Sequence, residues 1–266
     1  MIPMPINLSL SRRQIFPLLA GLVGLVGDIR PASSAEARIA RLIDQARGKC
    51  PISQRLDFIS AALRGTRYQG YTLVGSPRRP EKFVVRDDAF DCVTFCEAVL
   101  AAAIATAPAQ FDPILKTIRY HDGVVAWHER NHYFFEWCQH NVENRTCRWV
   151  NFEGAVDIEK TVDSQKGLGK RRFAMRVTPR ADFLANKNKL ESGDIVGFVT
   201  RRPDLDYFHI GFVAFDKTGA LLLRHASQSW HRVLDERMDR FMAVNGVRYV
   251  TLLRAQEPRG TETSKG

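Results

Sequence analysis

The chain has 266 residues, of which 45% are hydrophobic and 26% are charged, with 12 prolines and 18 glycines. This composition is that of an ordinary globular protein and excludes both a disordered chain and a collagen-like repeat. The length allows one large domain or two small ones. A formal net charge of +10 leaves nucleic acid, an anionic membrane surface or a polyanionic polymer as candidate partners.

The first 35 residues have the layout of a secretory signal. Arg12 and Arg13 precede an apolar stretch over residues 15–27, which is shorter than the ~18 residues of a membrane-spanning helix. Ser33 and Ala35 occupy the minus-three and minus-one positions of a cleavage site, so we expect removal after Ala35. The paired arginines make the segment similar to a twin-arginine signal, with an ordinary secretory signal as the alternative. Either signal predicts an exported, periplasmic protein.

The mature chain stays basic after this removal. The segment takes away three arginines and one aspartate, which changes the net charge from +10 to +8. No recognition helix, RNA-binding aromatic signature or concentrated basic stripe appears, and a periplasmic location argues against nucleic acid as a partner. We therefore expect an anionic cell-wall polymer as the partner, no membrane span, no cofactor and a monomer.

The mature chain is predicted to place helices first and strands last. Hydrophobic spacing predicts helices over residues 36–47, 52–64, 92–105, 112–120 and 128–141. A short strand is predicted over 83–86 and, after a polar and basic stretch from 160 to 180, strands over 194–200, 208–215, 220–225 and 247–253. This order is typical of the α+β class, with N-terminal helices packed on a mostly antiparallel sheet. Without a repeat or linker, we expect a single domain over residues 36–266.

The sequence has five cysteines: Cys50, Cys92, Cys96, Cys138 and Cys147. An odd number leaves at least one cysteine unpaired within the chain. Cys138 and Cys147, nine residues apart across a polar turn, are the pair that an oxidising compartment would allow to close a small loop. No pair combines with histidine at zinc-finger spacing, so we expect no metal site.

Cys92 follows Phe90-Asp91 at the start of the predicted Ala-rich, buried helix. Unpaired amide groups and the helix dipole stabilise an anion there, which predicts a thiol pKa lowered from about 8.5 into the range of about 3.5–7.5. A lone cysteine in an apolar helix is more often a small core residue, and that interpretation describes Cys96. Residues further along the chain distinguish Cys92.

Two histidines lie on neighbouring predicted strands. His209 follows Cys92 by 117 residues, and His225 follows His209 by 16. The first can act as the general base of the thiol, and the second can hold that imidazole in the right tautomer. Either histidine alone is more often a hydrogen-bonded core residue, but their joint order favours catalysis.

This order of short motifs resembles the NlpC-type cell-wall cysteine peptidases. The matching residues are Asp91-Cys92, Gly193-Asp194, His209-Ile210-Gly211 and His225-Ala226-Ser227. The resemblance implies a circularly permuted papain-like fold, with Cys92 as nucleophile, His209 as base and His225 as the orienting third member. Val93-Thr94 in place of the usual Ser-Gly, and a longer spacing with an insertion at about residues 106–185, point to a subfamily.

Two further segments are similar to the N-acetylmuramoyl-L-alanine amidase-like family. Residues 91–97 match its pattern Asp-Cys-(Thr/Val)-Thr-Phe-x-Glu, and a second pattern is matched by Arg130, His132, Tyr133, Phe134 and Trp137. The resemblance covers roughly residues 50–253. It implies hydrolysis of the amide between the lactyl group of N-acetylmuramic acid and L-alanine. The candidate substrate contacts are Asp91, Arg130, His132, Tyr133 and Ser227.

The expected chemistry proceeds through a thioester. His209 takes the proton of Cys92, the thiolate attacks the lactyl carbonyl, and water hydrolyses the thioester after the peptide amine leaves. The backbone N–H of Cys92 is a natural oxyanion donor. Glu97 either pairs with a neighbouring Lys or Arg or contacts substrate. Trp127 and Tyr133 either stack on a sugar or fill the core, whereas Trp137 is expected in the core.

Three alternatives remain open from the sequence. An endopeptidase of the same fold would cut between D-glutamate and the diamino acid of the stem peptide. Acyl transfer or lipid ester cleavage would keep the fold and change the chemistry. A catalytically inactive wall-binding protein would bind murein and release nothing.

Overall fold

The computed structural model describes residues 34–258. The predicted export signal lies outside these residues, except for Ser34 and Ala35, which begin the first helix. Within the described range, no helix has both the length and the apolar character needed to cross a bilayer.

Seven α-helices occur in the described part of the chain: α1 Ser34–Ala46, α2 Ile52–Ala62, α3 Cys92–Ile104, α4 Phe111–Arg119, α5 Phe134–Glu143, α6 Arg180–Ala185 and α7 Met238–Val244. The first four predicted helices are confirmed. The helix predicted over 128–141 begins only at Phe134, because Trp127–Glu129 forms a 3-10 turn and Tyr133 is extended. The helices α6 and α7 were not predicted.

The strands are β1 Arg67–Tyr68, β2 Val74–Ser76, β3 Arg79–Lys82, β4 Ala89–Phe90, β5 Cys147–Trp149, β6 Val156–Val162, β7 Arg171–Pro179, β8 Ile195–Val199, β9 Tyr207–Phe215, β10 Leu221–Ser227, β11 Arg232–Arg237 and β12 Tyr249–Ala255. The four C-terminal strands that the sequence predicts are confirmed as β8, β9, β10 and β12. The strand predicted over 83–86 is wrong, since these residues link β3 to β4 without strand pairing.

The main sheet has ten strands in the order β4-β1-β11-β10-β9-β8-β12-β7-β6, with β5 also pairing β12. Every pair in it is antiparallel except β1 with β4, which confirms a mostly antiparallel sheet in an α+β protein. The strands β2 and β3 form a separate hairpin.

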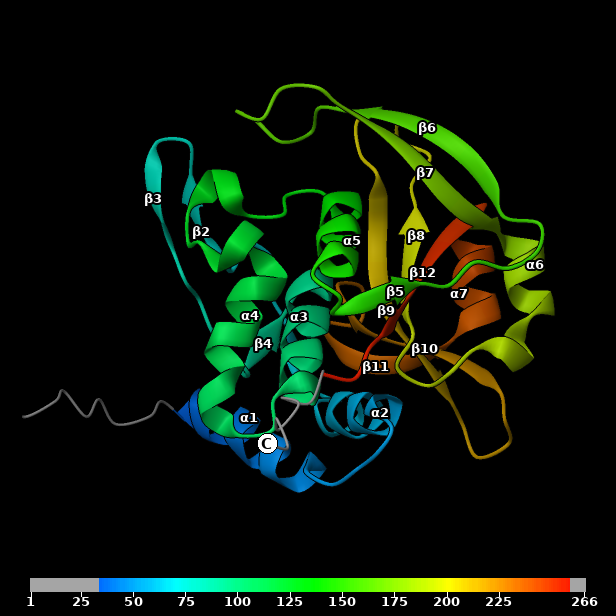
Figure 1. Ribbon diagram of the computed structural model, residues 1–266. Coiled ribbons are helices and arrows are strands. Elements are labelled where there is room, and N and C mark those ends of the chain that lie inside the picture. Colours follow the sequence, from blue (N-terminus) through cyan, green and yellow to red (C-terminus); the bar gives the residue numbers. More distant parts are fainter. Residues whose placement is uncertain (1–33, 259–266) are drawn as a thin grey trace, which may run out of the picture. The chain divides into compact units, whose positions relative to one another are not determined.

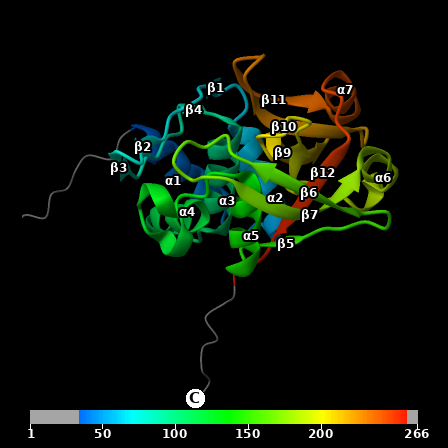
Figure 2. The same ribbon diagram turned by 90° about the horizontal axis from the view of Figure 1, so that it is seen from above.

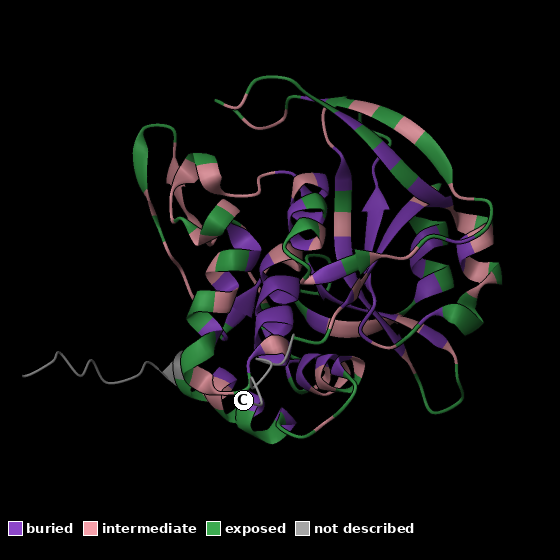
Figure 3. Cartoon of the chain, in the orientation of Figure 1, coloured by how far each residue is buried: buried purple, intermediate pink, exposed green. Residues whose placement is uncertain are grey.

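Helices cover both faces of the sheet. Figures 1 and 2 show α1 to α5 gathered on one side and α6 with α7 on the other. The period-two alternation of strand side chains divides the core accordingly: Ile210 and Phe212 join the cluster around α3, whereas Val213 and Leu223 join the cluster around α7. The α3 helix is buried along most of its length, as Figure 3 shows. Within this helix only Cys92 and Val93 at the start and Ile104 at the end are partly exposed.

Candidate active site

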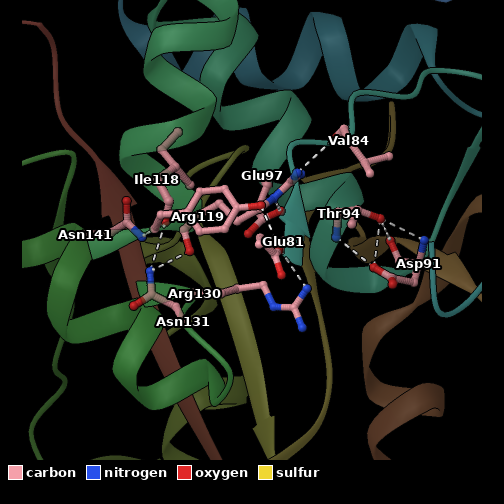
Figure 4. Close-up of polar contacts among 11 residues, drawn as sticks. Glu81, Val84, Asp91, Thr94, Glu97, Ile118, Arg119, Arg130, Asn131 and Asn141 are labelled. Atoms are coloured by element: carbon pink, nitrogen blue, oxygen red, sulfur yellow. Dashed lines mark hydrogen bonds and ion pairs between the residues drawn. The ribbon is translucent and has the colours of Figure 1, made fainter. Parts of the chain in front are cut away.

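The helix α3 begins at Cys92 because the preceding residues form a capping box. The Asp91 carboxylate accepts the backbone N–H of Thr94 at 2.8 Å, and the Thr94 hydroxyl accepts the backbone N–H of Asp91 at 3.0 Å (Figure 4). Phe95, one turn along, anchors the helix with its ring 5.8 Å from Phe90 and 5.6 Å from Phe212. The Asp-Cys-x-Thr-Phe motif is thus a device that fixes where Cys92 lies.

The Cys92 thiol is protonated in this environment, contrary to the expectation from its helix position. Burial and then the charge of Asp91 raise its pKa to about 12, and backbone N–H groups of Ile210, Cys92 and Val93 offset this only in part. Desolvation of the thiolate outweighs the helix terminus because Cys92 packs against the hydrophobic core. The predicted lowering of this pKa is therefore wrong.

His209 and His225 form a hydrogen-bonded pair. Nε2 of His209 lies 2.6 Å from Nδ1 of His225, with the two rings nearly perpendicular. Burial, followed by the proximity of His225, lowers the pKa of His209 well below its usual value, and burial lowers that of His225 to about 4. Both imidazoles are neutral at neutral pH. Gly211 permits this approach, because a Cβ there would lie 2.9 Å from the Cβ of His225.

The histidine pair adjoins Cys92 through the backbone of β9. The backbone N–H of Ile210, the residue after His209, is near enough to the sulfur to lower the pKa of the thiol, and Cys92 packs against the core around α3. The ring of His209 instead lies 5.4 Å from that of Phe241 on α7. Over residues 34–258, no hydrogen bond joins the thiol to either imidazole. The structure brings His209 and His225 together on the side of β9 that faces α7, whereas Cys92 packs on the α3 side, so the pairing of Cys92 with His209 stays a prediction.

Cys92 lines a cleft of about 670 Å³. Its walls come from the start of α3, the loop before β2 and the segment before α5. The lining includes Tyr71, Asp91, Cys92, Arg130, His132 and Gln165. Arg130 and His132 also line a neighbouring cavity of about 270 Å³, together with His121, His128, His140 and Arg171. The two hollows meet at the segment that the second family-like motif occupies.

Two Glu–Arg pairs lie at the cleft, and Glu97, Arg119 and Arg130 contribute to its lining (Figure 4). Glu97 accepts from Nε of Arg119 at 2.7 Å, and both side chains are 3% exposed. Burial opposes the charge of Arg119, but the Glu97 carboxylate outweighs it and raises the pKa of Arg119. Glu81, on β3, accepts from Nη1 of Arg130 at 3.0 Å and from the Tyr120 hydroxyl at 2.9 Å. Glu97 is therefore paired with Arg119, and its carboxylate is not free.

The remaining predicted contacts divide into two groups. Arg130 and His132 line the cleft; Nε2 of His132 donates to the carbonyl of Trp127 at 2.7 Å, and burial lowers its pKa to about 4. Tyr133 and Ser227 are buried, at 1% and 5% exposed. The Tyr133 hydroxyl accepts the N–H of Gln165, and Ser227 accepts that of Trp230. Both hydroxyls are thus engaged with the backbone, and the roles of Tyr133 and Ser227 as substrate contacts stay predictions.

All five cysteines are free thiols, so Cys138 and Cys147 form no disulfide and the odd count does not single out Cys92. Among residues 34–258, no group of His, Cys, Asp and Glu side chains is arranged to hold a metal ion.

The conformation of Tyr71 and the burial of Glu81 were not predicted from the sequence. Tyr71, fully exposed at the cleft and with a φ of 58°, adopts a left-handed conformation that is uncommon for a bulky residue. Glu81 has a side chain with no exposed surface, although it lies in the polar, mostly exposed strand β3. A buried acid in a polar segment leaves no periodic signal, so only the folded chain reveals it.

The model of the N-acetylmuramoyl-L-alanine amidase-like family matches residues 58–246. Comparison with curated proteins finds no match. Among solved structures, a Legionella pneumophila protein aligns with a TM-score of 0.73 at 19% identity, covering 84% of this chain and 95% of that one. An N-acetylmuramoyl-L-alanine amidase from Bacteroides uniformis aligns with a TM-score of 0.65 at 21% identity, over 77% and 99% of the two chains. At these identities the structures support the fold.

Proposed function

This chain belongs to the N-acetylmuramoyl-L-alanine amidase-like family, and from that premise we propose that it hydrolyses the bond between N-acetylmuramic acid and L-alanine with Cys92 as nucleophile. The observation that carries the proposal is the position of the thiol. Cys92 is fixed by the capping box in the lining of the cleft and lies beside β9, the strand that carries His209. We also propose that the arrangement is a permuted papain-like fold of the NlpC type.

The polar groups around the histidine pair favour the tautomers that a general base needs. Nε2 of His225 makes no hydrogen bond among residues 34–258, but Oε2 of Glu236 lies 3.4 Å from it, and the negative charge of that carboxylate favours a proton on this nitrogen. Nδ1 of His225 then accepts from Nε2–H of His209 at 2.6 Å. This leaves the lone pair of His209 on Nδ1, the atom that is free to take a proton. His225 is a positioning residue in this scheme.

The neutral resting state defines the first step. Because the thiol and both imidazoles are uncharged, the proton leaves Cys92 as the sulfur attacks, rather than from a preformed ion pair. Hydrogen bonds between catalytic groups are often long in unliganded enzymes and tighten when substrate binds, and we infer that the Cys92–His209 contact forms in this way.

The rest of the reaction follows from the same groups. The S–C bond forms as the lactyl carbonyl oxygen becomes an oxyanion, which the backbone N–H groups at the start of α3 stabilise. The proton on His209 passes to the peptide nitrogen, the C–N bond breaks, and the L-alanine amine departs. Water then gives a proton to His209, its oxygen attacks the thioester carbon, and the thiol is regenerated.

A glycosidase is the chemical alternative that one structural neighbour suggests. A candidate xylanase from Bacteroides fragilis aligns with a TM-score of 0.59 at 22% identity, covering 73% of this chain and 98% of that one. Glycoside hydrolysis requires two available carboxyl groups. In this cleft Asp91 caps α3 and Glu97 is paired with Arg119, so both are already engaged. The thiol supports amide hydrolysis better.

Mass spectrometry of muropeptide digests tests the proposal. The wild type should release a peptide that begins with L-alanine, and Cys92→Ala should release none. The matched control is Cys96→Ala, one turn further along α3 in the buried core, which should retain the product. Sugar that keeps L-Ala-D-Glu would identify the endopeptidase instead. Binding of murein without any product would identify an inactive wall-binding protein, and an unchanged pattern in Cys92→Ala would exclude this nucleophile.

A further inference from the structure

We propose that Arg130, held in place by Glu81, recognises a carboxylate of the stem peptide in the cleft; this inference rests on the proposed amidase function and adds a substrate determinant. Arg130 borders both the Cys92 cleft and the adjoining histidine-lined cavity. A group bound there contacts the substrate on the side of the cleft formed by residues 130–132. The inference makes Arg130 a specificity residue and Glu81 a positioning residue.

The guanidinium of Arg130 has one end bound and one end available. Nη1 donates to Oε1 of Glu81 at 3.0 Å, whereas Nε and Nη2 have no hydrogen-bond partner among residues 34–258. Figure 4 shows the second terminal nitrogen pointing away from Glu81. The side chain is 14% exposed. A planar guanidinium with free, partly desolvated N–H groups matches a carboxylate, which it can bind through two parallel hydrogen bonds.

Glu81 fixes the orientation of this fork. Its side chain has no exposed surface, and its Oε1 receives both the Arg130 guanidinium and the Tyr120 hydroxyl. Gly75 faces it so closely that a Cβ there would lie 1.8 Å from Oε2. A carboxylate enclosed in this way cannot follow a moving arginine, so the arginine is held instead. Holding a long side chain in one rotamer reduces the entropy lost when a ligand binds.

The neighbouring pair shows what a purely structural arginine looks like. Arg119 donates to Glu97 and to the carbonyl of Val84, and its side chain is 3% exposed. Arg130 shares the Glu partner but lacks the second acceptor and remains more exposed. The difference leaves Arg130 with donors that a substrate can use.

The stem peptide offers two carboxylates of this chemistry. A D-glutamate linked through its side chain keeps its α-carboxylate, and the last residue of the peptide carries the other. Three muramoyl peptides separate the sources: one with both carboxylates free, one with the D-glutamate α-carboxylate amidated, and one with the terminal carboxylate amidated. The wild type should lose about 10- to 100-fold in kcat/KM with one of the two amides, as expected for a hydrogen bond to a charged group.

The variants assign that preference to residues. Arg130→Gln should raise KM for the acid substrate by a similar factor and leave kcat within about twofold. It should leave the discriminated amide unaffected. Glu81→Gln should raise KM for the acid several-fold in the same selective manner. The control is Glu159→Gln, from the surface pair of Glu159 and Arg172, which should change neither substrate. Equal losses for acid and amide in Arg130→Gln would reduce the residue to a structural role and overturn the inference.

Binding measurements keep this test separate from turnover. Calorimetry with Cys92→Ala should show tighter binding of the acid than of the discriminated amide, and Arg130→Gln in that background should remove the difference. If the wild type cleaves no muramoyl peptide, the proposed function fails while this comparison still decides the carboxylate site. Equal affinities of Cys92→Ala for the acid and both amides would overturn the inference even in an active enzyme.

Discussion

Cys92 is subject to two opposing electrostatic effects. The N-terminus of α3 and three backbone N–H groups favour the thiolate, whereas burial and the charge of Asp91 disfavour it. Desolvation is the largest contribution, so the thiol stays protonated until substrate and base are present. His209 is neutral for the same reason, since burial disfavours its imidazolium. Cys92 and His209 therefore do not form a charged pair at rest.

The pH dependence of activity should reflect these neutral imidazoles. A general base is active only when unprotonated, and the pKa of His209 lies well below its usual 6.5 while that of His225 lies at about 4. We expect kcat/KM to stay level as pH falls from about 8 through 6.5 and to decline only below that value. Initial rates at saturating buffer capacity measure this profile. An acid limb centred at 6.5 or higher would contradict the neutral, desolvated pair.

At the scale of elements, the sequence predicted the helix α3 but not the hairpin of β6 and β7. The boundaries of α3 follow from its capping box and its continuous apolar run, and both are local. The hairpin of β6 and β7 was missed because its charges suggested a polar loop. Phe173, Met175 and Val177 are nevertheless buried at alternate positions, with Ala174 and Arg176 exposed between them, which is the period of a half-buried strand.

The buried Glu97–Arg119 pair ties α3 to α4, and its removal should destabilise the fold. Glu97→Gln leaves the Arg119 guanidinium buried without its charge partner, and the expected loss in free energy of unfolding is about 3–5 kcal/mol. The matched control is Glu159→Gln, whose partner Arg172 is 71% exposed, with an expected change of about 0–1 kcal/mol. Urea denaturation measures both. Similar losses in the two variants would show that α3 and α4 do not depend on this pair.

At the scale of the whole molecule, the cellular location of the protein is a prediction from its N-terminal segment. We propose that residues 1–35 export the protein to the periplasm. The basic charge of the mature chain suits the anionic cell-wall polymer that we propose as its substrate there. Replacing Arg12 and Arg13 by lysine should retain the full-length chain in the cytoplasm if the twin-arginine route is used. Cell fractionation with immunoblotting measures this. Unchanged export would indicate the ordinary secretory route, and a cytoplasmic wild type would overturn the proposal.

The sequence by itself determined the features that depend on neighbouring residues. Helix starts, strand alternation and the order of the motifs around Cys92, His209 and His225 are local in the chain, and they were sufficient for the α+β class and the family. The resemblance identified Arg130 and His132 as candidate contacts, and both line the cleft.

Only the tertiary structure decided the features that depend on burial and on long-range contact. The pKa of Cys92 rises rather than falls because desolvation depends on what surrounds the sulfur. Tyr133 and Ser227 are buried, which their positions in the sequence did not reveal. Glu81 met Arg130 across 49 residues, a separation at which neither propensity nor periodicity carries information. Chain-local patterns therefore set the framework, and the three-dimensional packing set the charge states and the shape of the site.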